Sequence, residues 1–303
     1  MSALAAGIVA AAVAGCGFGA NPGSKAADVR VSSDFGSDVL GTATEQHVPK
    51  GETVMSLLKR HFKVATTDGG GLVRSIAGRA GGADHLTWSY YVNGIAATKG
   101  AAVTDVYKSD HIWWDLHSSA AAGTVPAVVG SYPEPFTDGL DGQEYPTLLE
   151  CAGNLQKACD AVGSSLAKAG VKAGPQVLGT GSGSDSLAVV VGTWNEIQGV
   201  IAAEMIAAGP GSSGVYAQFV GKHGQELELD NPLGDVVKTL SGTVGMIAAT
   251  DQAALGAPTW FVTGTNVAAV DNAAKYFNSR TLDGRFAVVI EGSKVVPIPL
   301  TGT

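Results

Sequence analysis

The stretch His85–Thr98 reads HLTWSYYVNGIAAT and joins a ring-rich segment to the dipeptide Asn93-Gly94. Its three aromatic residues fall within four positions: Trp88, Tyr90 and Tyr91. An Asn-Gly pair between apolar residues is a strong local signal for a β-hairpin, because a type I′ turn requires positive φ at both central residues. The sequence therefore predicts a strand over His85–Val92 that turns at Asn93-Gly94.

The segments on either side of this hairpin predict a small sheet that carries one helix. Val54–His61 places apolar residues on one helical face, and Thr53 is in position to cap the helix. The other strands are expected from apolar alternation at Asp28–Leu40, Val73–Ala77 and His111–His117. Residues 28–117 are therefore expected to form one small domain.

The rings of the two ring-rich strands should divide between the faces of this sheet, because side chains alternate along a strand. One face carries Trp88, Tyr90 and Trp114. The opposite face carries Tyr91, Asn93 and Trp113, and His and Asp residues flank Trp113 there. Rings with polar groups favour recognition surfaces, so Tyr91 and Trp113 are the first candidates for ligand contact.

All six of these residues form the predicted ligand-binding set: Trp88, Tyr90, Tyr91, Asn93, Trp113 and Trp114. Stacking on the rings would supply the binding, and the Asn93 amide and the Tyr hydroxyls would orient the ligand. The alternative is structural. In that case Trp88, Tyr90 and Trp114 fill a small core, and Trp113 covers this core from outside.

Three separated motifs in this region resemble the DUF4430 family, which is similar to the C-terminal domain of transcobalamin and to soluble ligand-binding β-grasp domains. The motifs are the segments 52–58 (ETVMSLL), 88–94 (WSYYVNG) and 110–114 (DHIWW). Ser109 stands where the family pattern has Gly. The resemblance implies a β-grasp sheet that presents rings to a planar or cobalamin-like ligand. It does not transfer cobalamin itself, because the sequence offers no helical barrel.

The N-terminal residues predict export and lipidation. Ala3–Val13 is an apolar run too short to span a bilayer, and Val13–Cys16 is similar to a bacterial lipobox. We therefore expect a signal peptide at 1–15, a lipid on Cys16 and a tether at 16–27, which places the protein on the outer face of the cell membrane. No Lys or Arg precedes the run, so chance Ala richness stays open as the alternative.

The two other cysteines, Cys151 and Cys159, favour a disulfide in an exported protein. In one continuous helix their Cα atoms would lie about 12 Å apart, whereas a disulfide needs less than about 7 Å. Pairing therefore requires the chain to reverse between them, and Gly153-Asn154 supplies good turn residues. Two reduced thiols in a helix are the alternative.

The rest of the chain predicts a connector at 118–144 and a second domain at 145–303 in which strands and helices alternate. The expected strands are Leu148–Cys151, Leu187–Val191, Val215–Val220, Thr259–Thr263 and Phe286–Ile290. The expected helices are Cys159–Gly170, Ile197–Ala208 and Val267–Phe277, the last capped by Asn266. The predicted fold class is therefore α+β, with a β-grasp-like sheet followed by an α/β-type domain.

Composition and motifs argue against several function classes. Hydrophobic residues are 45% of the 303 positions and the net charge is -8, which disfavours a nucleic-acid partner. His111 and His117 share a strand face with Asp115, but the two histidines would lie about 20 Å apart along the strand, too far to bind one metal ion. The acidic stretch 138–144 lacks a calcium-loop pattern. Neither the Gly-rich loop 179–186 nor the pair Ser165 and Lys168 belongs to a complete catalytic motif. We expect no enzyme and no metal.

These observations lead to two expected functions. The first is a lipid-anchored extracytoplasmic binding protein whose aromatic surface holds a small ligand, for delivery to a membrane transporter. The second is a cell-envelope interaction or scaffold lipoprotein, in which the same rings dock a partner protein or a cell-wall polymer.

Overall fold

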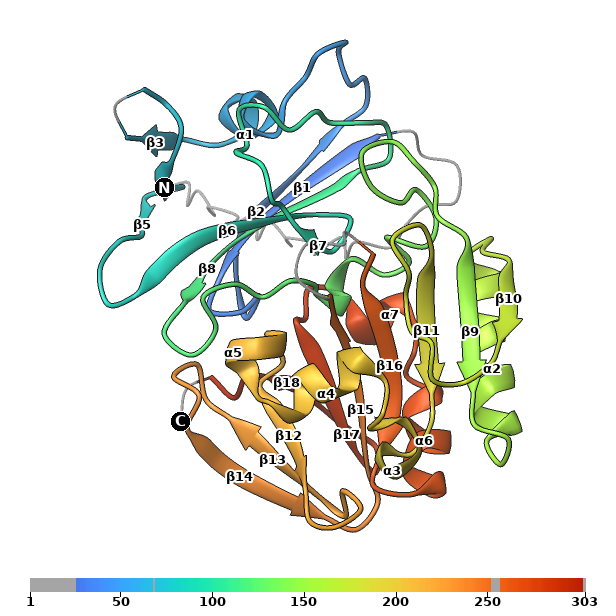
Figure 1. Cartoon of the computed structure of the whole chain (residues 1–303). Coiled ribbons are helices and arrows are strands. Elements are labelled where there is room, and N and C mark those ends of the chain that lie inside the picture. The colour runs from blue at the N-terminus through green and yellow to red at the C-terminus, as the bar shows by residue number, and fades with distance from the viewer. Residues whose placement is uncertain (1–25, 68, 252–256, 302–303) are drawn as a thin grey trace, which may run out of the picture.

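The computed structural model describes residues 26–67, 69–251 and 257–301 (Figure 1). Within these residues the fold is mixed α+β, and it has a first half built on a small sheet and a second half built on a larger one. The predicted signal peptide, most of the tether and the predicted lipidation site Cys16 lie outside the described residues.

The small sheet of the first half has the strand order β2-β1-β8-β6-β7. Its strands are β1 (Ala27–Ser33), β2 (Asp38–Glu45), β6 (Leu86–Val92), β7 (Ile95–Ala96) and β8 (His111–Ser118). β1 runs parallel to β8, and the other neighbours are antiparallel. The prediction of one strand over Asp28–Leu40 is wrong. Consecutive positive φ angles at Asp34 (56°), Phe35 (56°) and Gly36 (83°) reverse the chain there.

Helix α1 (Val54–His61) covers one face of this sheet, and its bounds are those predicted from the sequence. Thr53 caps it by accepting a hydrogen bond from the backbone N of Ser56 at 3.2 Å. Val54, Leu57 and Leu58 are fully buried in a cluster that also contains Trp114. Three short strands, β3 (Val64–Thr66), β4 (Val73–Ile76) and β5 (Arg79–Ala80), form a separate sheet beside the helix.

The predicted hairpin is present between β6 and β7. Asn93 has φ 54° and Gly94 has φ 79°, as a type I′ turn requires. Val92 pairs with Ile95 across the turn. The local signal was sufficient to predict this turn because it depends on two adjacent residues alone.

The larger sheet of the second half has the strand order β10-β9-β11-β16-β15-β17-β18. Its strands are β9 (Thr147–Cys151), β10 (Ala173–Gln176), β11 (Leu187–Val191), β15 (Val244–Thr250), β16 (Thr259–Gly264), β17 (Ala287–Glu291) and β18 (Lys294–Ile298). β10, β9, β11 and β16 are mutually parallel, and the last three strands are added antiparallel.

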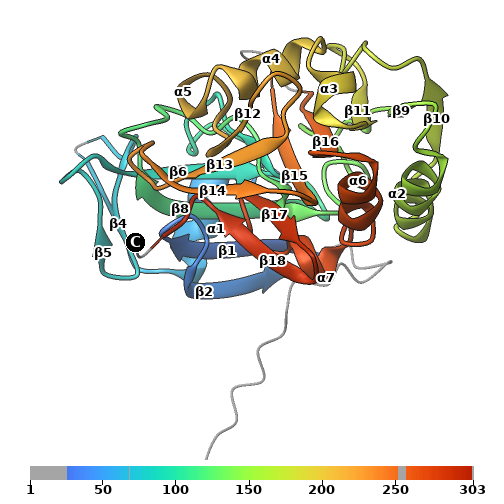
Figure 2. The ribbon, with the colours of Figure 1, turned by 90° about the horizontal axis from the view of Figure 1, so that it is seen from below.

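The two faces of this sheet are covered by different elements (Figure 2). Helices α2 (Gln156–Lys168) and α6 (Val267–Ala274) pack on one face, and Asn266 caps α6 as predicted. The other face is covered by α3 (Trp194–Ile197), α4 (Ile201–Ala207) and α5 (Pro210–Ser213), with the antiparallel strands β12 (Ala217–Val220), β13 (Glu226–Asp230) and β14 (Val236–Ser241). One helix was predicted over Ile197–Ala208, but the chain breaks it at 198–200, where Gly199 disfavours helix.

The predicted disulfide between Cys151 and Cys159 is confirmed, with a Cα–Cα distance of 6.0 Å. Cys151 ends β9 and Cys159 lies in the first turns of α2. The chain reverses between them at Gly153-Asn154, as the sequence analysis required.

The face of the small sheet opposite α1 packs against the second half and forms a buried aromatic interface. The interface cluster contains Phe35, Tyr91, Trp113, Val128, Tyr216 and Phe286. Phe286 precedes β17, and its ring centroid lies 5.2 Å from that of Trp113. The two halves therefore share an apolar core across their junction.

Asp115 anchors a hydrogen-bond network beside these rings. Its carboxylate accepts from Ser32 Oγ at 2.5 Å, from the backbone N of Gly36 at 2.9 Å, and lies 2.9 Å from His117 Nδ1. Ser32 Oγ in turn accepts from Trp113 Nε1 at 2.7 Å. The network satisfies the indole N–H of Trp113 and the buried carboxylate of Asp115, and it fixes the indole in one orientation.

The segment 118–144, expected to be a connector, packs tightly at the junction. It contains the short 3-10 helix η1 (Val129–Ser131), and Val128 and Val129 are fully buried. A Cβ at Gly130 would lie 2.6 Å from the backbone N of Arg285 and 2.7 Å from Trp113 Cζ3. The absence of a side chain at Gly130 therefore lets the segment pass between Trp113 and the second half.

Gly130→Ala is expected to lower the free energy of unfolding by about 1–3 kcal/mol, because the added methyl has no space at the junction. Gly123→Ala is the matched control, since no atom lies within 4 Å of a Cβ there. Its effect should be within about 0.5 kcal/mol. Urea denaturation followed by Trp fluorescence measures both variants. Equal effects would contradict the close packing at Gly130.

Candidate functional site

Three of the predicted ligand-contact rings lie on the α1 side of the small sheet. Trp114 is 3% exposed, and its ring is stacked on Tyr90 with the centroids 4.7 Å apart. Trp88 and Tyr90 are half-buried and pack against the same core. These three rings therefore occupy the positions that the structural alternative assigned to them.

Tyr91 and Trp113, the first candidates for ligand contact, are not at the surface. Tyr91 is 0% exposed and Trp113 is 2% exposed, and both pack against Phe286 of the second half. The expectation that they form an open ligand surface is corrected by this burial. The polar neighbours of Trp113 serve the internal Asp115 network, which the sequence pattern could not distinguish from a wet binding surface.

Asn93 is also buried, and it joins three segments. Its amide nitrogen donates to Asp110 Oδ1 at 3.0 Å and to the carbonyl of Gly139 at 2.8 Å. Its amide oxygen accepts from the backbone N of His111 at 2.8 Å. Asn93 therefore acts as a positioning residue that holds the start of β8 against the segment before β9.

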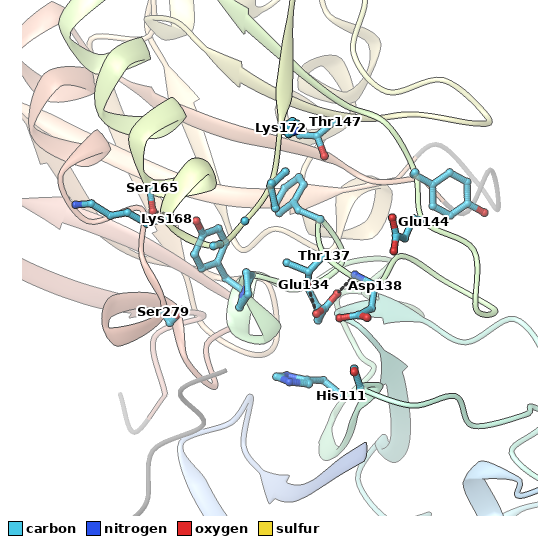
Figure 3. Close-up of a pocket in the computed structure, with 18 of the residues that line it drawn as sticks. His111, Glu134, Thr137, Asp138, Glu144, Thr147, Ser165, Lys168, Lys172 and Ser279 are labelled. Carbon is cyan, nitrogen blue, oxygen red and sulfur yellow. Dashed lines mark hydrogen bonds between the residues drawn. The ribbon is translucent and has the colours of Figure 1, made fainter. Parts of the chain in front are cut away.

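A cavity of about 790 Å³ opens at this junction, and we call it the junction cavity (Figure 3). Asp28 and His111 line it from the first half. The segment Tyr132–Asp138 lines its middle. Thr147, the last turn of α2 with Ser165 and Lys168, and the residues after this helix up to Lys172 line it from the second half. Its volume lies in the range of small-molecule sites.

Glu134 is the most buried acidic group of the junction cavity, with 2% exposure. Its carboxyl group accepts a hydrogen bond from the hydroxyl of Thr137 and another from the backbone N of Asp138 at 2.9 Å. Burial, reinforced by the neighbouring Asp138 carboxylate, raises the pKa of Glu134 to about 8. Glu134 therefore carries a proton near neutral pH.

Other charged groups lie around Glu134. Asp138 is half-buried and Glu144 is exposed, and both line the junction cavity (Figure 3). His111 Nε2 lies 3.9 Å from Asp28 Oδ2, and burial lowers the pKa of His111. The middle of the cavity is therefore acidic, with one imidazole beside it.

The pair Ser165 and Lys168 lines the same cavity, but Ser165 is engaged elsewhere. Its hydroxyl donates to the carbonyl of Phe277 at 2.5 Å and lies 2.9 Å from the hydroxyl of Tyr132. Figure 3 shows the Lys168 side chain extending away from Ser165. The hydroxyl of Ser165 is therefore hydrogen-bonded to Phe277 and Tyr132, and not to Lys168 as a nucleophile–base pair would require.

The Gly-rich loop 179–186 uses its backbone donors internally. The buried carboxylate of Glu150 accepts from the backbone N atoms of Gly179 at 3.0 Å, Thr180 at 3.1 Å and Gly181 at 2.8 Å. A carboxylate of the chain itself therefore occupies the position that a phosphate would take in a phosphate-binding loop.

The junction cavity could not be predicted from the sequence, because its middle lies in the segment expected to be a connector. Glu134 stands between Pro133 and Pro135, a pattern that indicates only a turn-rich segment. The stretch 138–144 lacks a calcium-loop pattern, so its acidic residues indicate only a solvated turn. No local signal places these carboxyl groups opposite His111, since the cavity forms only when the two halves pack together.

Residues 51–118 match the model of a family described as a domain of unknown function (DUF4430). The match runs from just before α1 to the end of β8, so this part of the chain is a DUF4430 domain, as the motifs indicated. The chain matches no curated protein. None of the helices in the described residues is long and apolar enough to cross a bilayer.

Glu134→Gln is expected to flatten the pH dependence of stability between about pH 5 and about pH 8. The pKa of Glu134 is raised in the fold to about 8. The stability that this shift contributes is therefore fully present below the pKa of Glu134 in the unfolded chain, and it is lost as pH rises through about 8. The variant should gain stability relative to the wild type as pH rises. Urea denaturation at the two pH values measures this difference.

The matched control is Glu144→Gln, which changes an exposed carboxyl group of the same cavity. It should keep the wild-type pH dependence. An unchanged slope in Glu134→Gln would contradict a protonated Glu134 in the native state.

Proposed function

We propose that this protein is a lipid-anchored extracytoplasmic binding protein that holds a small organic ligand in the junction cavity. The observation that carries the proposal is the cavity itself, whose walls come from the DUF4430 domain, the segment after it and the second half. Its lining combines aromatic rings with carboxyl, hydroxyl and amine groups, as small-molecule sites do. A binding function also agrees with Ser165, because its hydroxyl donates to the carbonyl of Phe277 and is not paired with a base.

The tight interface between the halves supports a preformed site. Trp113 lies against Gly130 and Phe286, and Arg30 Nη1 forms an ion pair with Asp283 Oδ1 at 3.0 Å across the junction. The residues that line the cavity are therefore already ordered before a ligand binds, which lowers the entropic cost of binding.

The β-grasp arrangement is part of this proposal. Parallel pairing of β1 with β8, antiparallel neighbours on both sides of this pair and α1 across one face support it. The ligand position differs from the one that the resemblance implied, because the rings opposite α1 are covered. A whole corrinoid is larger than a drug-sized molecule, so we expect a smaller ligand than cobalamin.

The location rests on the N-terminal sequence. Val13–Cys16 is similar to a lipobox, and the disulfide between Cys151 and Cys159 is typical of exported proteins. The membrane is then a partner through the lipid, and a membrane transporter would receive the ligand.

Cys16→Ser is expected to release the protein from the membrane fraction of its native host, because the thiol that accepts the lipid is removed. Cell fractionation and intact mass measurement of the wild-type protein provide the readouts. Cys151→Ser is the control, since it leaves the proposed anchor intact. An unprocessed wild-type chain without lipid would contradict the proposed location.

Lys172→Trp is expected to weaken ligand binding by about tenfold or more, because a large ring at the exposed rim fills the cavity mouth. Ligand-observed NMR with a panel of amines, amino acids, flavins, haem and corrinoids measures binding. Lys222→Trp is the control, since this exposed lysine lies outside the junction cavity. Absence of any binding, with an envelope protein recovered by crosslinking, would support the interaction or scaffold function instead.

A further inference from the structure

Building on the proposed function, we propose that the ligand of the junction cavity is an organic amine, bound as its ammonium ion against Glu134 and Asp138. An ammonium group offers N–H donors and a positive charge, and a pair of carboxyl groups accepts both. The inference depends on the proposed site and adds the chemical class of its ligand.

Three carboxyl groups of the cavity, those of Glu134, Asp138 and Glu144, have no lysine or arginine partner in the described chain. Within residues 26–67, 69–251 and 257–301, no Lys or Arg forms an ion pair with Glu134, Asp138 or Glu144. The carboxyl group of Glu134 is nearly inaccessible to water, so it can ionise only at a high cost without a nearby cation. A positively charged ligand would supply that missing charge.

Thr147 provides a second, independent indication of a ligand. The residue is 4% exposed and lines the junction cavity, and its hydroxyl has no hydrogen-bond partner among the described residues. Figure 3 places Thr147 beside Lys172, on the side of the cavity opposite His111. A buried hydroxyl without a partner is costly, and a ligand donor would satisfy its oxygen.

Aromatic rings between these polar groups define the body of the ligand. Tyr132 and Phe136 line the cavity, and their ring centroids lie 6.2 Å apart at an edge-to-face angle of 63°. Such rings accept an apolar body and also favour a nearby cation through their π faces. The expected ligand is therefore an ammonium ion attached to an apolar group.

A bare metal cation and an anion fit the cavity less well. Among the described residues, no three His, Cys, Asp or Glu side chains have the geometry to share a metal ion. An anion would meet Glu134, Asp138 and Glu144 together. The lysines of the cavity, Lys168 and Lys172, are exposed at its rim.

Binding should release a proton from the protein. Near neutral pH the Glu134 carboxyl group holds a proton, because burial raises its pKa to about 8. An ammonium ion beside it favours the carboxylate, so the proton passes to solvent when the ligand binds. Affinity for an amine that stays largely protonated over the same pH range should therefore rise with pH.

Isothermal titration calorimetry of the mature protein tests the inference, with benzylamine as the probe and benzyl alcohol as its neutral isostere. Benzylamine should bind at least about ten times more tightly than the alcohol. Its affinity should rise about tenfold or more between about pH 6.5 and about pH 8.5, and Glu134→Gln should remove this rise.

Glu134→Gln and Asp138→Asn should each weaken benzylamine binding by about tenfold, the loss of one charge-assisted hydrogen bond. Glu226→Gln is the matched control, since it makes the same change at an exposed carboxyl group on β13, outside the cavity. It should change affinity less than about twofold. If Glu134→Gln does not fold, Asp138→Asn and the comparison of the two probes decide the question.

Equal affinity of the wild-type protein for benzylamine and benzyl alcohol would overturn the inference, as would undiminished benzylamine binding in Asp138→Asn. If panel compounds bind and Lys172→Trp blocks them without any preference for amines, the proposed function stands and the ligand class is wrong. If nothing binds in a manner that Lys172→Trp blocks, the proposed function fails as well.

Discussion

The indole of Trp113 lies between two backbones that have no side chain at the point of contact. A Cβ at Gly36 would approach Trp113 Cζ2 to 2.9 Å, and a Cβ at Gly130 would approach Cζ3 to 2.7 Å. The first glycine belongs to the β1–β2 turn and the second to the segment that leads into the second half. Truncating a buried Trp typically costs about 3–5 kcal/mol, so the packing of the whole Trp113 side chain contributes a large part of a typical domain's stability. Trp113 and His111 both belong to β8. Because the packing of Trp113 fixes this strand, it also fixes the position of His111 in the cavity.

Local signals in the sequence were enough to predict the elements that depend on neighbouring residues. The Asn93-Gly94 turn, helix α1 with its Thr53 cap, and the reversal that lets Cys151 meet Cys159 are all of this kind. The two faces of the small sheet were also predicted correctly from strand alternation. Strand alternation could not predict which part of the chain covers the face that carries Tyr91 and Trp113.

The missing information lies far along the chain. Phe286 covers Trp113 and Tyr91, and nothing in the sequence near Phe286 indicates that it does so. A ring flanked by His and Asp has the same pattern whether water, a ligand or a distant segment covers it. Glu134 was missed for a related reason. Its burial arises from the packing of the halves, while its local sequence indicates only turns. Strand β14 was missed because its side chains are mostly exposed and give no apolar face.

The outermost strands of the larger sheet each contain a proline: Pro175 in β10 and Pro297 in β18. A proline has no N–H to offer an incoming strand, so both open edges of the sheet are poor templates for pairing with another chain. At high protein concentration, folded copies of a chain can meet edge to edge. These two residues would then keep neighbouring molecules from joining their sheets into aggregates.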